Sequence, residues 1–123
     1  MTGRAILFGV LLTTLTMPAG AGERMTVRVS PAVAFAPANL IVRARIEADA
    51  QNRAVEIVAE STEFYRSSEI QLDGENAPRT SVIEFRSLPP GVYEVKATLL
   101  GPGGAPRASV RQAVNVIASA AGQ

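Results

Sequence analysis

The sequence predicts an all-β fold: an antiparallel Greek-key β-sandwich of about seven strands. Two observations support this prediction. From residue 25 onward, apolar and polar side chains alternate with a period of two, which is typical of strands with one buried and one solvated face. Segments rich in Gly, Pro, Asn and Asp separate these runs at spacings of roughly 8–14 residues, as in sandwiches and barrels.

The alternating runs define the expected strands in order. They cover residues 25–30, 39–48, 53–60, 67–73, 81–87, 92–99 and 108–117. Turn-forming segments lie at 48–52, 59–61, 73–78, 88–91 and 101–106. Pro31 and Pro37 bracket a further segment that we predict to be an edge strand that breaks and changes course, because each proline lacks the N–H that a central strand donates.

The segment LPPG (88–91) predicts a sharp crossing between two strands at one end of the sandwich. Tyr93 follows near the start of the expected sixth strand, with its ring on the inward face. A buried tyrosine hydroxyl needs a hydrogen-bond partner. We therefore predict that the hydroxyl bonds to the backbone just upstream, as in the tyrosine corner of Greek-key sandwiches.

The segment LPPGVYEVKATLLGPGGAPRASVRQAVNVI (88–117) resembles the last two strands of immunoglobulin-like and fibronectin type III-like domains of bacterial exported proteins. The resemblance covers residues 25–117, and its motif is Pro-Pro-Gly-x-Tyr-x-Val. The chain has no Cys and no Trp, so the antibody-type core is absent. A second resemblance, of DGENAPRTSVIEFRSLPPGVYEVKATLLG (73–101) to the C-terminal half of carboxypeptidase regulatory-like domains, is the runner-up. Both resemblances imply a spacer, stabilising or binding module rather than an enzyme.

The N-terminus predicts a cleaved secretory signal peptide over residues 1–21. Arg4 precedes thirteen uncharged residues (5–17), and Ala19 and Ala21 form a small-residue exit. The apolar run is shorter than the roughly 18–20 residues that a bilayer span needs. We expect residues 22–123 to form one domain in the periplasm or outside the cell, without membrane insertion after cleavage.

The composition of this expected domain argues against several kinds of binding and catalysis. Basic and acidic residues balance once Arg4 is removed, and the basic residues are scattered, so nucleic-acid binding is not expected. The chain has no His and no Cys, which removes imidazole and thiolate ligands and catalytic triads. No metal, cofactor or catalytic residue is predicted. Glu56 and Glu94 are carboxylates on solvated faces, and Asp73-Gly74 is interpreted as a plain turn rather than a calcium loop.

The segment 61–80 contains the best candidate for a partner-binding site. Phe64 and Tyr65 are adjacent, so in an extended strand they point to opposite faces; we expect the core to take Phe64. Tyr65 and Arg66, with Val58 nearby, are therefore predicted to contact another envelope or extracellular protein. The alternatives are a small-ligand or carbohydrate-binding domain, a carboxylate-based hydrolase, and a structural subunit that joins an assembly through an open strand edge at the Pro31–Pro37 segment.

Overall fold

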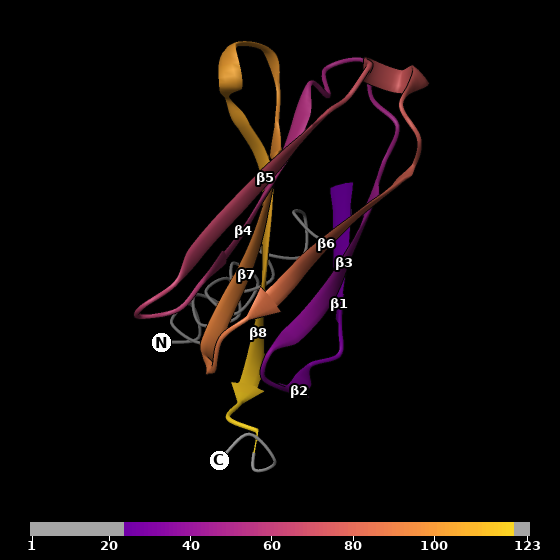
Figure 1. The fold of residues 1–123 in the computed structure, drawn as a ribbon. Helices are drawn as coiled ribbons and strands as arrows, with labels where there is room; N and C mark the ends of the chain where they lie inside the picture. The colour runs from indigo at the N-terminus through magenta and orange to yellow at the C-terminus, as the bar shows by residue number, and fades with distance from the viewer. Residues whose placement is uncertain (1–23, 120–123) are drawn as a thin grey trace, which may run out of the picture.

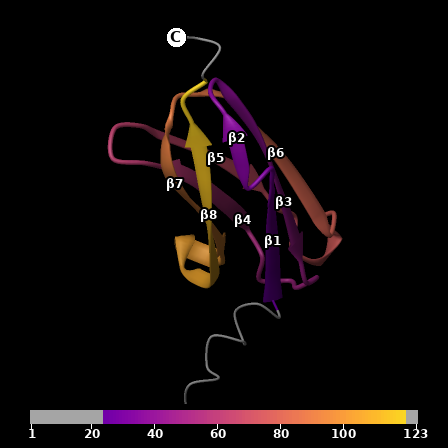
Figure 2. The same ribbon diagram turned by 90° about the horizontal axis from the view of Figure 1, so that it is seen from below.

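The computed structural model describes residues 24–119 and confirms the all-β sandwich. A small sheet has the strand order β1-β3-β6, and a large sheet has the order β2-β8-β7-β4-β5 (Figure 1). The two sheets pack as layers, and the chain crosses between them after β1, β2, β3, β5 and β6 (Figure 2). The predicted signal peptide lies outside the described residues. The strands are β1 (Met25–Ser30), β2 (Val33–Phe35), β3 (Ala38–Ile46), β4 (Ala54–Glu60), β5 (Tyr65–Gln71), β6 (Thr80–Leu88), β7 (Gly91–Leu100) and β8 (Pro106–Ile117).

The predicted alternation produces the core directly. Inward-facing residues of β3, such as Leu40 and Val42, are fully buried, and so are Val55 and Ile57 of β4 and Val95 of β7. Most of their neighbours along each strand are exposed or partly exposed, because successive side chains of a strand point to opposite faces. The hydrophobic core therefore lies between the sheets, and no buried side-chain nitrogen or oxygen of the described residues lacks a hydrogen-bond partner.

The Pro31–Pro37 segment lies at a sheet edge and changes course, as predicted. β1 pairs with β3 in the small sheet, and after Pro31 the chain moves to the large sheet, where β2 pairs with β8. The structure has eight strands, because the predicted edge segment forms β2 in addition to the seven alternating runs. One detail differs from the antiparallel prediction: β2 pairs with β8 in parallel. Parallel pairing follows from the sheet switch, since the chain keeps its direction when it passes from one sheet to the other.

The side chain of Gln112 fastens β1 to β8 beside this switch. Its Oε1 accepts from the Val29 N–H at 3.2 Å, and its Nε2 donates to the Val29 carbonyl at 3.3 Å. One amide thus satisfies both backbone groups of a residue on the edge of the small sheet. This contact joins the two sheets at one side of the sandwich, because no strand of one sheet pairs there with a strand of the other.

The tyrosine corner is confirmed, although the strand is the seventh rather than the sixth. The Tyr93 hydroxyl donates to the Pro89 carbonyl at 2.7 Å, and the residue is 1% exposed. Burial raises the pKa of Tyr93 above 10, so the hydroxyl stays protonated and able to donate. Its ring meets the edge of the Phe64 ring with centroids 6.1 Å apart. The corner therefore holds the β6–β7 crossing against the β4–β5 hairpin.

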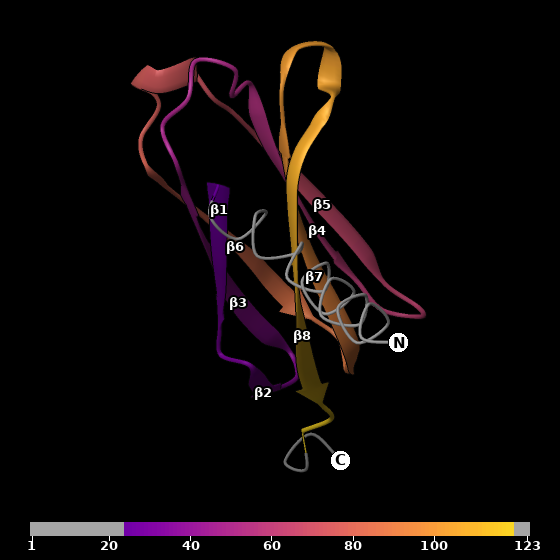
Figure 3. The same ribbon diagram turned by 180° about the vertical axis from the view of Figure 1, so that it is seen from behind.

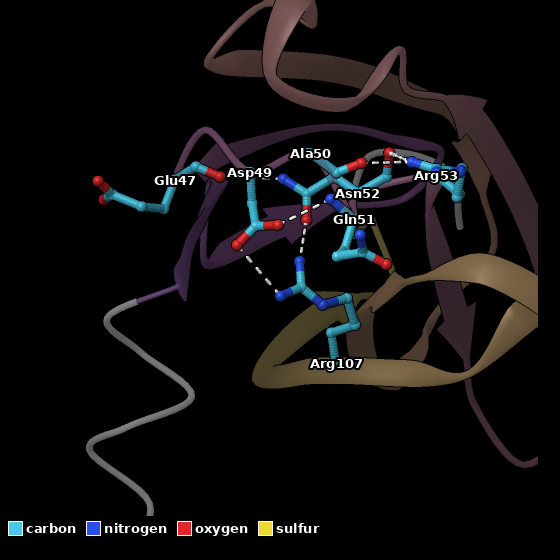
Figure 4. Close-up of polar contacts among 7 residues, drawn as sticks. All are labelled: Glu47, Asp49, Ala50, Gln51, Asn52, Arg53 and Arg107. Atoms are coloured by element: carbon cyan, nitrogen blue, oxygen red, sulfur yellow. Dashed lines mark hydrogen bonds and ion pairs between the residues drawn. The ribbon is translucent and has the colours of Figure 1, made fainter.

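The β3–β4 loop is held by a polar network that crosses to β8 (Figure 4). Asn52 is 2% exposed; it donates to the Glu47 carbonyl at 2.9 Å and accepts from the Arg107 guanidinium. Arg107 also pairs with Asp49 at 3.2 Å, and Asp49 accepts from the Gln51 N–H at 2.7 Å. The network thereby ties a loop between the two sheets to the last strand of the large sheet.

The ionisation of Asp49 is expected to make stability depend on acid pH. The Gln51 N–H and then the Arg107 guanidinium lower the pKa of Asp49 from 3.8. The unfolded chain therefore binds a proton first, so the stabilisation present above about pH 4 is lost as pH falls through the lowered folded-state pKa. Urea melts of wild type and Asp49→Asn should differ by a constant amount from pH 7 to 5 and converge below about pH 4. A difference that stays constant down to pH 2 would contradict this assignment.

Candidate functional site

The outer face of the large sheet brings two of the three predicted site residues together. Tyr65 begins β5 and is 59% exposed, opposite Glu60 of β4. Val58 lies two residues back along β4, opposite Lys96 of β7. Tyr65 and Val58 line one hollow of about 180 Å³ together with Glu56, Glu60, Glu94, Lys96 and Thr98.

Arg66 lies on the other side of β5 and is not part of this hollow. Its guanidinium carbon lies 5.1 Å from the centroid of the Phe64 ring, within cation–π distance. Its Nη1 donates to the Arg86 carbonyl of β6 at 3.0 Å. Arg66 therefore bridges the two sheets at the side opposite Gln112. Phe64 is partly buried against the core, as the sequence predicted.

A group of exposed apolar side chains, which we call the apolar corner, lies at one end of the same face. Phe35 of β2 and Ile117 of β8 are paired in register and are 66% and 40% exposed. Two residues before Ile117 on β8 lies Asn115, which pairs with Val33 of β2 on one side and with Val92 of β7 on the other. These two valines are 59% and 72% exposed. The ribbon in Figure 3 shows β2 beside the end of β8. The apolar corner consists of Val33, Phe35, Val92 and Ile117.

An open hollow of about 640 Å³ adjoins the apolar corner at Val92. Glu60 and Glu94 lie directly opposite each other on β4 and β7 and line this hollow with Arg111 of β8. The two carboxylates noted in the sequence, Glu56 and Glu94, are not in one row: four residues of strand separate them, or about 13 Å. Among residues 24–119, no group of three carboxylates could hold a metal ion.

The two outer faces carry opposite charge. The face of the small sheet holds Arg28, Arg43 and Arg45, and Arg28 lies directly opposite Arg43. On the large sheet, Glu56 lies opposite Glu69, and Glu60 lies opposite Glu94. Like charges directly opposite each other destabilise a sheet modestly, so each of these pairs is expected to cost the fold some stability.

Sequence reasoning missed the apolar corner, although part of its signal was present. Val92 has the phase of Glu94, and Ile117 has the phase of Asn115, so alternation alone places both side chains on the solvated face. The phase of Phe35 could not be read, because the flanking prolines leave too short a run. Nor does any sequence pattern place β2, β7 and β8 side by side.

The fold has structural relatives of several kinds. The superoxide reductase (neelaredoxin) from Ignicoccus hospitalis is 10% identical, with a TM-score of 0.60 over 75% of this chain and 79% of that one. The sulfur carrier protein SoxY from Chlorobium limicola f thiosulfatophilum is 13% identical, with a TM-score of 0.54 over 76% and 78%. A family 76 glycoside hydrolase from a bovine Bacteroides thetaiotaomicron strain is 18% identical, with a TM-score of 0.54 over 75% of this chain and 20% of that one.

These similarities show the fold, an all-β sandwich, and nothing about the activity of the protein. No family model matches the sequence, and no curated protein matches it significantly. Because the chain has neither His nor Cys, it has no imidazole or thiolate ligand to offer a metal. Residues 24–119 include no helix of the length and apolarity needed to cross a membrane.

Proposed function

We propose that the protein is an exported, non-catalytic β-sandwich module that binds another envelope or extracellular protein through the large sheet. The observation that carries this proposal is the apolar corner. Four large apolar side chains, 40–72% exposed, meet on one face of a small domain. A rimmed apolar patch of this kind is typical of protein interaction sites. Tyr65 and Val58 lie on the same face and extend the proposed surface, with acidic side chains between them and the apolar corner.

Export is the second part of the proposal and depends on the N-terminal sequence. Arg4, the uncharged run and the Ala19–Ala21 exit support cleavage after residue 21. Protein purified from an exporting host is expected to have the intact mass of residues 22–123. Soluble cytoplasmic protein that keeps residues 1–21 would contradict the proposed export.

Affinity capture from the native envelope fraction tests the binding role. We expect Phe35→Ser with Val92→Ser to reduce capture of the partner at least tenfold, because the corner would lose its two most exposed apolar groups. The matched control is Val82→Ser, which removes a 55% exposed valine from the small sheet and should leave capture unchanged. All variants should keep the wild-type stability within about 0.5 kcal/mol, as for surface substitutions.

Separate variants test the residues predicted from sequence. Tyr65→Ala is expected to weaken capture with little loss of stability, because its ring is exposed on the proposed surface. Arg66→Ala is expected to weaken capture with little loss of stability if Arg66 contacts the partner. It is expected to lower stability and leave capture unchanged if Arg66 serves only its contacts with Phe64 and the Arg86 carbonyl. Full capture by every variant would place the binding face elsewhere, and hydrolytic activity with no captured protein would favour the enzyme alternative.

A further inference from the structure

The open edge of the large sheet is β5, and it is longer than the edge that the sequence suggested. β2 has three residues, whereas β5 has seven, with no proline and no register shift in its pairing with β4. No strand among residues 24–119 pairs with the far side of β5. β5 has no bulge, proline or lysine to block pairing with another strand, and its two charged side chains are already engaged: Arg66 with Phe64 and the Arg86 carbonyl, and Glu69 with Gln71.

The hydrogen bonds that flank β5 show which of its backbone groups are unpaired. The Phe64 carbonyl accepts from Ser61, and the Leu72 N–H donates to Arg53, so even-numbered residues direct their backbone groups toward β4. Because this direction alternates along an antiparallel strand, Tyr65, Ser67 and Glu69 direct their N–H and C=O groups away from the sheet. β5 therefore presents a regular row of donors and acceptors.

We propose that β5 pairs with β5 of a second copy of this chain in an antiparallel arrangement, with Ser67 on the two-fold axis. The two large sheets then form one continuous sheet of ten strands. Tyr65, Ser67 and Glu69 of each copy exchange backbone hydrogen bonds with Glu69, Ser67 and Tyr65 of the other. Such an isologous contact closes after two copies.

Charge selects this register over its neighbours. A two-fold axis at Arg66 places Arg66 opposite its own copy and Glu63 opposite Glu69, and an axis at Glu69 places Glu69 opposite itself. Like charges directly opposite each other are unfavourable in both arrangements. With the axis at Ser67, Glu69 faces Tyr65 and Arg66 faces Ser68, so no like charges meet.

An axis at Tyr65 or Ile70 pairs at most three residues of β5 with β5 of the other copy, and burial selects Ser67 over Ser68. Phe64 and Ile70 are partly buried and pack against the core from this edge. With the axis at Ser67, Phe64 of one copy lies opposite Ile70 of the other at a non-hydrogen-bonded position, where side chains approach most closely. An axis at Ser68 places Ile70 opposite Arg66, which already contacts Phe64 and the Arg86 carbonyl. The self-pairing at Ser67 thus extends the apolar core across the axis.

Single cysteines test the register, because the chain contains none of its own. Under mild oxidation, Ser67→Cys is expected to form a covalent dimer, since paired residues on the axis lie about 5.5 Å apart, within disulfide range. Ser68→Cys is the matched control and should remain uncrosslinked. Crosslinking of Ser68→Cys in place of Ser67→Cys, or of neither, would overturn the assigned register.

Sedimentation velocity over a concentration series tests the dimer itself. Wild type is expected to dimerise, and Ser67→Pro should weaken dimerisation at least tenfold, because proline removes an outward N–H at the axis. At a concentration where both proteins are monomeric, its thermal melt should match wild type, since β4 does not use that N–H. Wild type that stays monomeric at all concentrations overturns the proposal, as does an unweakened Ser67→Pro dimer. Neither result bears on capture through the apolar corner.

Discussion

Replacing Tyr93 with phenylalanine is expected to lower the free energy of unfolding by about 1–3 kcal/mol, because the partly buried Pro89 carbonyl loses its hydrogen bond from the hydroxyl of the buried Tyr93 ring. The hydroxyl donates to Pro89 at 2.7 Å inside the crossing between β6 and β7. Tyr93→Ala should cost more, about 3–5 kcal/mol, because it also leaves a cavity beside Phe64. Urea denaturation measures both values.

The second tyrosine of the chain provides the matched control. Tyr65 is 59% exposed, so Tyr65→Phe should leave the stability within about 0.5 kcal/mol of wild type. If Tyr93→Phe were as stable as Tyr65→Phe, the hydroxyl bond to Pro89 would contribute nothing and the corner would be held by ring packing alone.

Asn52→Ala is expected to destabilise the domain by about 2–4 kcal/mol, since it removes one neutral hydrogen bond and one charged one. Asn52 donates to the Glu47 carbonyl and accepts from Arg107, whose side chain is 16% exposed. The substitution therefore leaves a largely buried guanidinium with Asp49 as its remaining partner.

Gln51→Ala is the control, because Gln51 is an exposed neighbour in the same loop and should change the stability by less than about 0.5 kcal/mol. A double-mutant cycle with Arg107→Met should give a coupling energy of about 1 kcal/mol or more. Additive effects of the two substitutions would show that Asn52 stabilises the loop without Arg107.

How well the sequence predicts a contact of this fold depends on how many residues separate the two partners along the chain. The tyrosine corner was predictable because Tyr93 and Pro89 are four residues apart and the prolines fix the chain between them. The bond from Arg107 to Asn52 spans 55 residues, and no local pattern marks it. Ser87 likewise adopts a φ of 60°, unusual for a non-glycine residue, where its N–H donates to Asn39 at 3.0 Å, 48 residues away.

The candidate site was predictable only in part, for the same reason. Alternation placed Tyr65 and Val58 correctly on one face of a sheet. The same alternation places Arg66 on the opposite side of β5 from Tyr65, but it could not show that Arg66 contacts Phe64 and β6 of the other sheet. The net charge near zero also gave no sign of the two oppositely charged faces. A net charge is summed over the whole chain and does not depend on the side of the sheet on which each residue lies.

After β1 the chain leaves the small sheet and forms β2 in the large sheet. This change of sheet determines how the domain would bear mechanical load. β2 runs parallel to β8, and Figure 1 shows β1 running toward the same end of the molecule, so β1 begins far from the end at which β8 finishes. Tension between these two points pulls β2 and β8 past each other rather than peeling them apart. The backbone bonds of that pair and both Gln112 contacts with Val29 then carry the force together. Rupture requires them to break almost simultaneously, which is the geometry of a link that resists stretching.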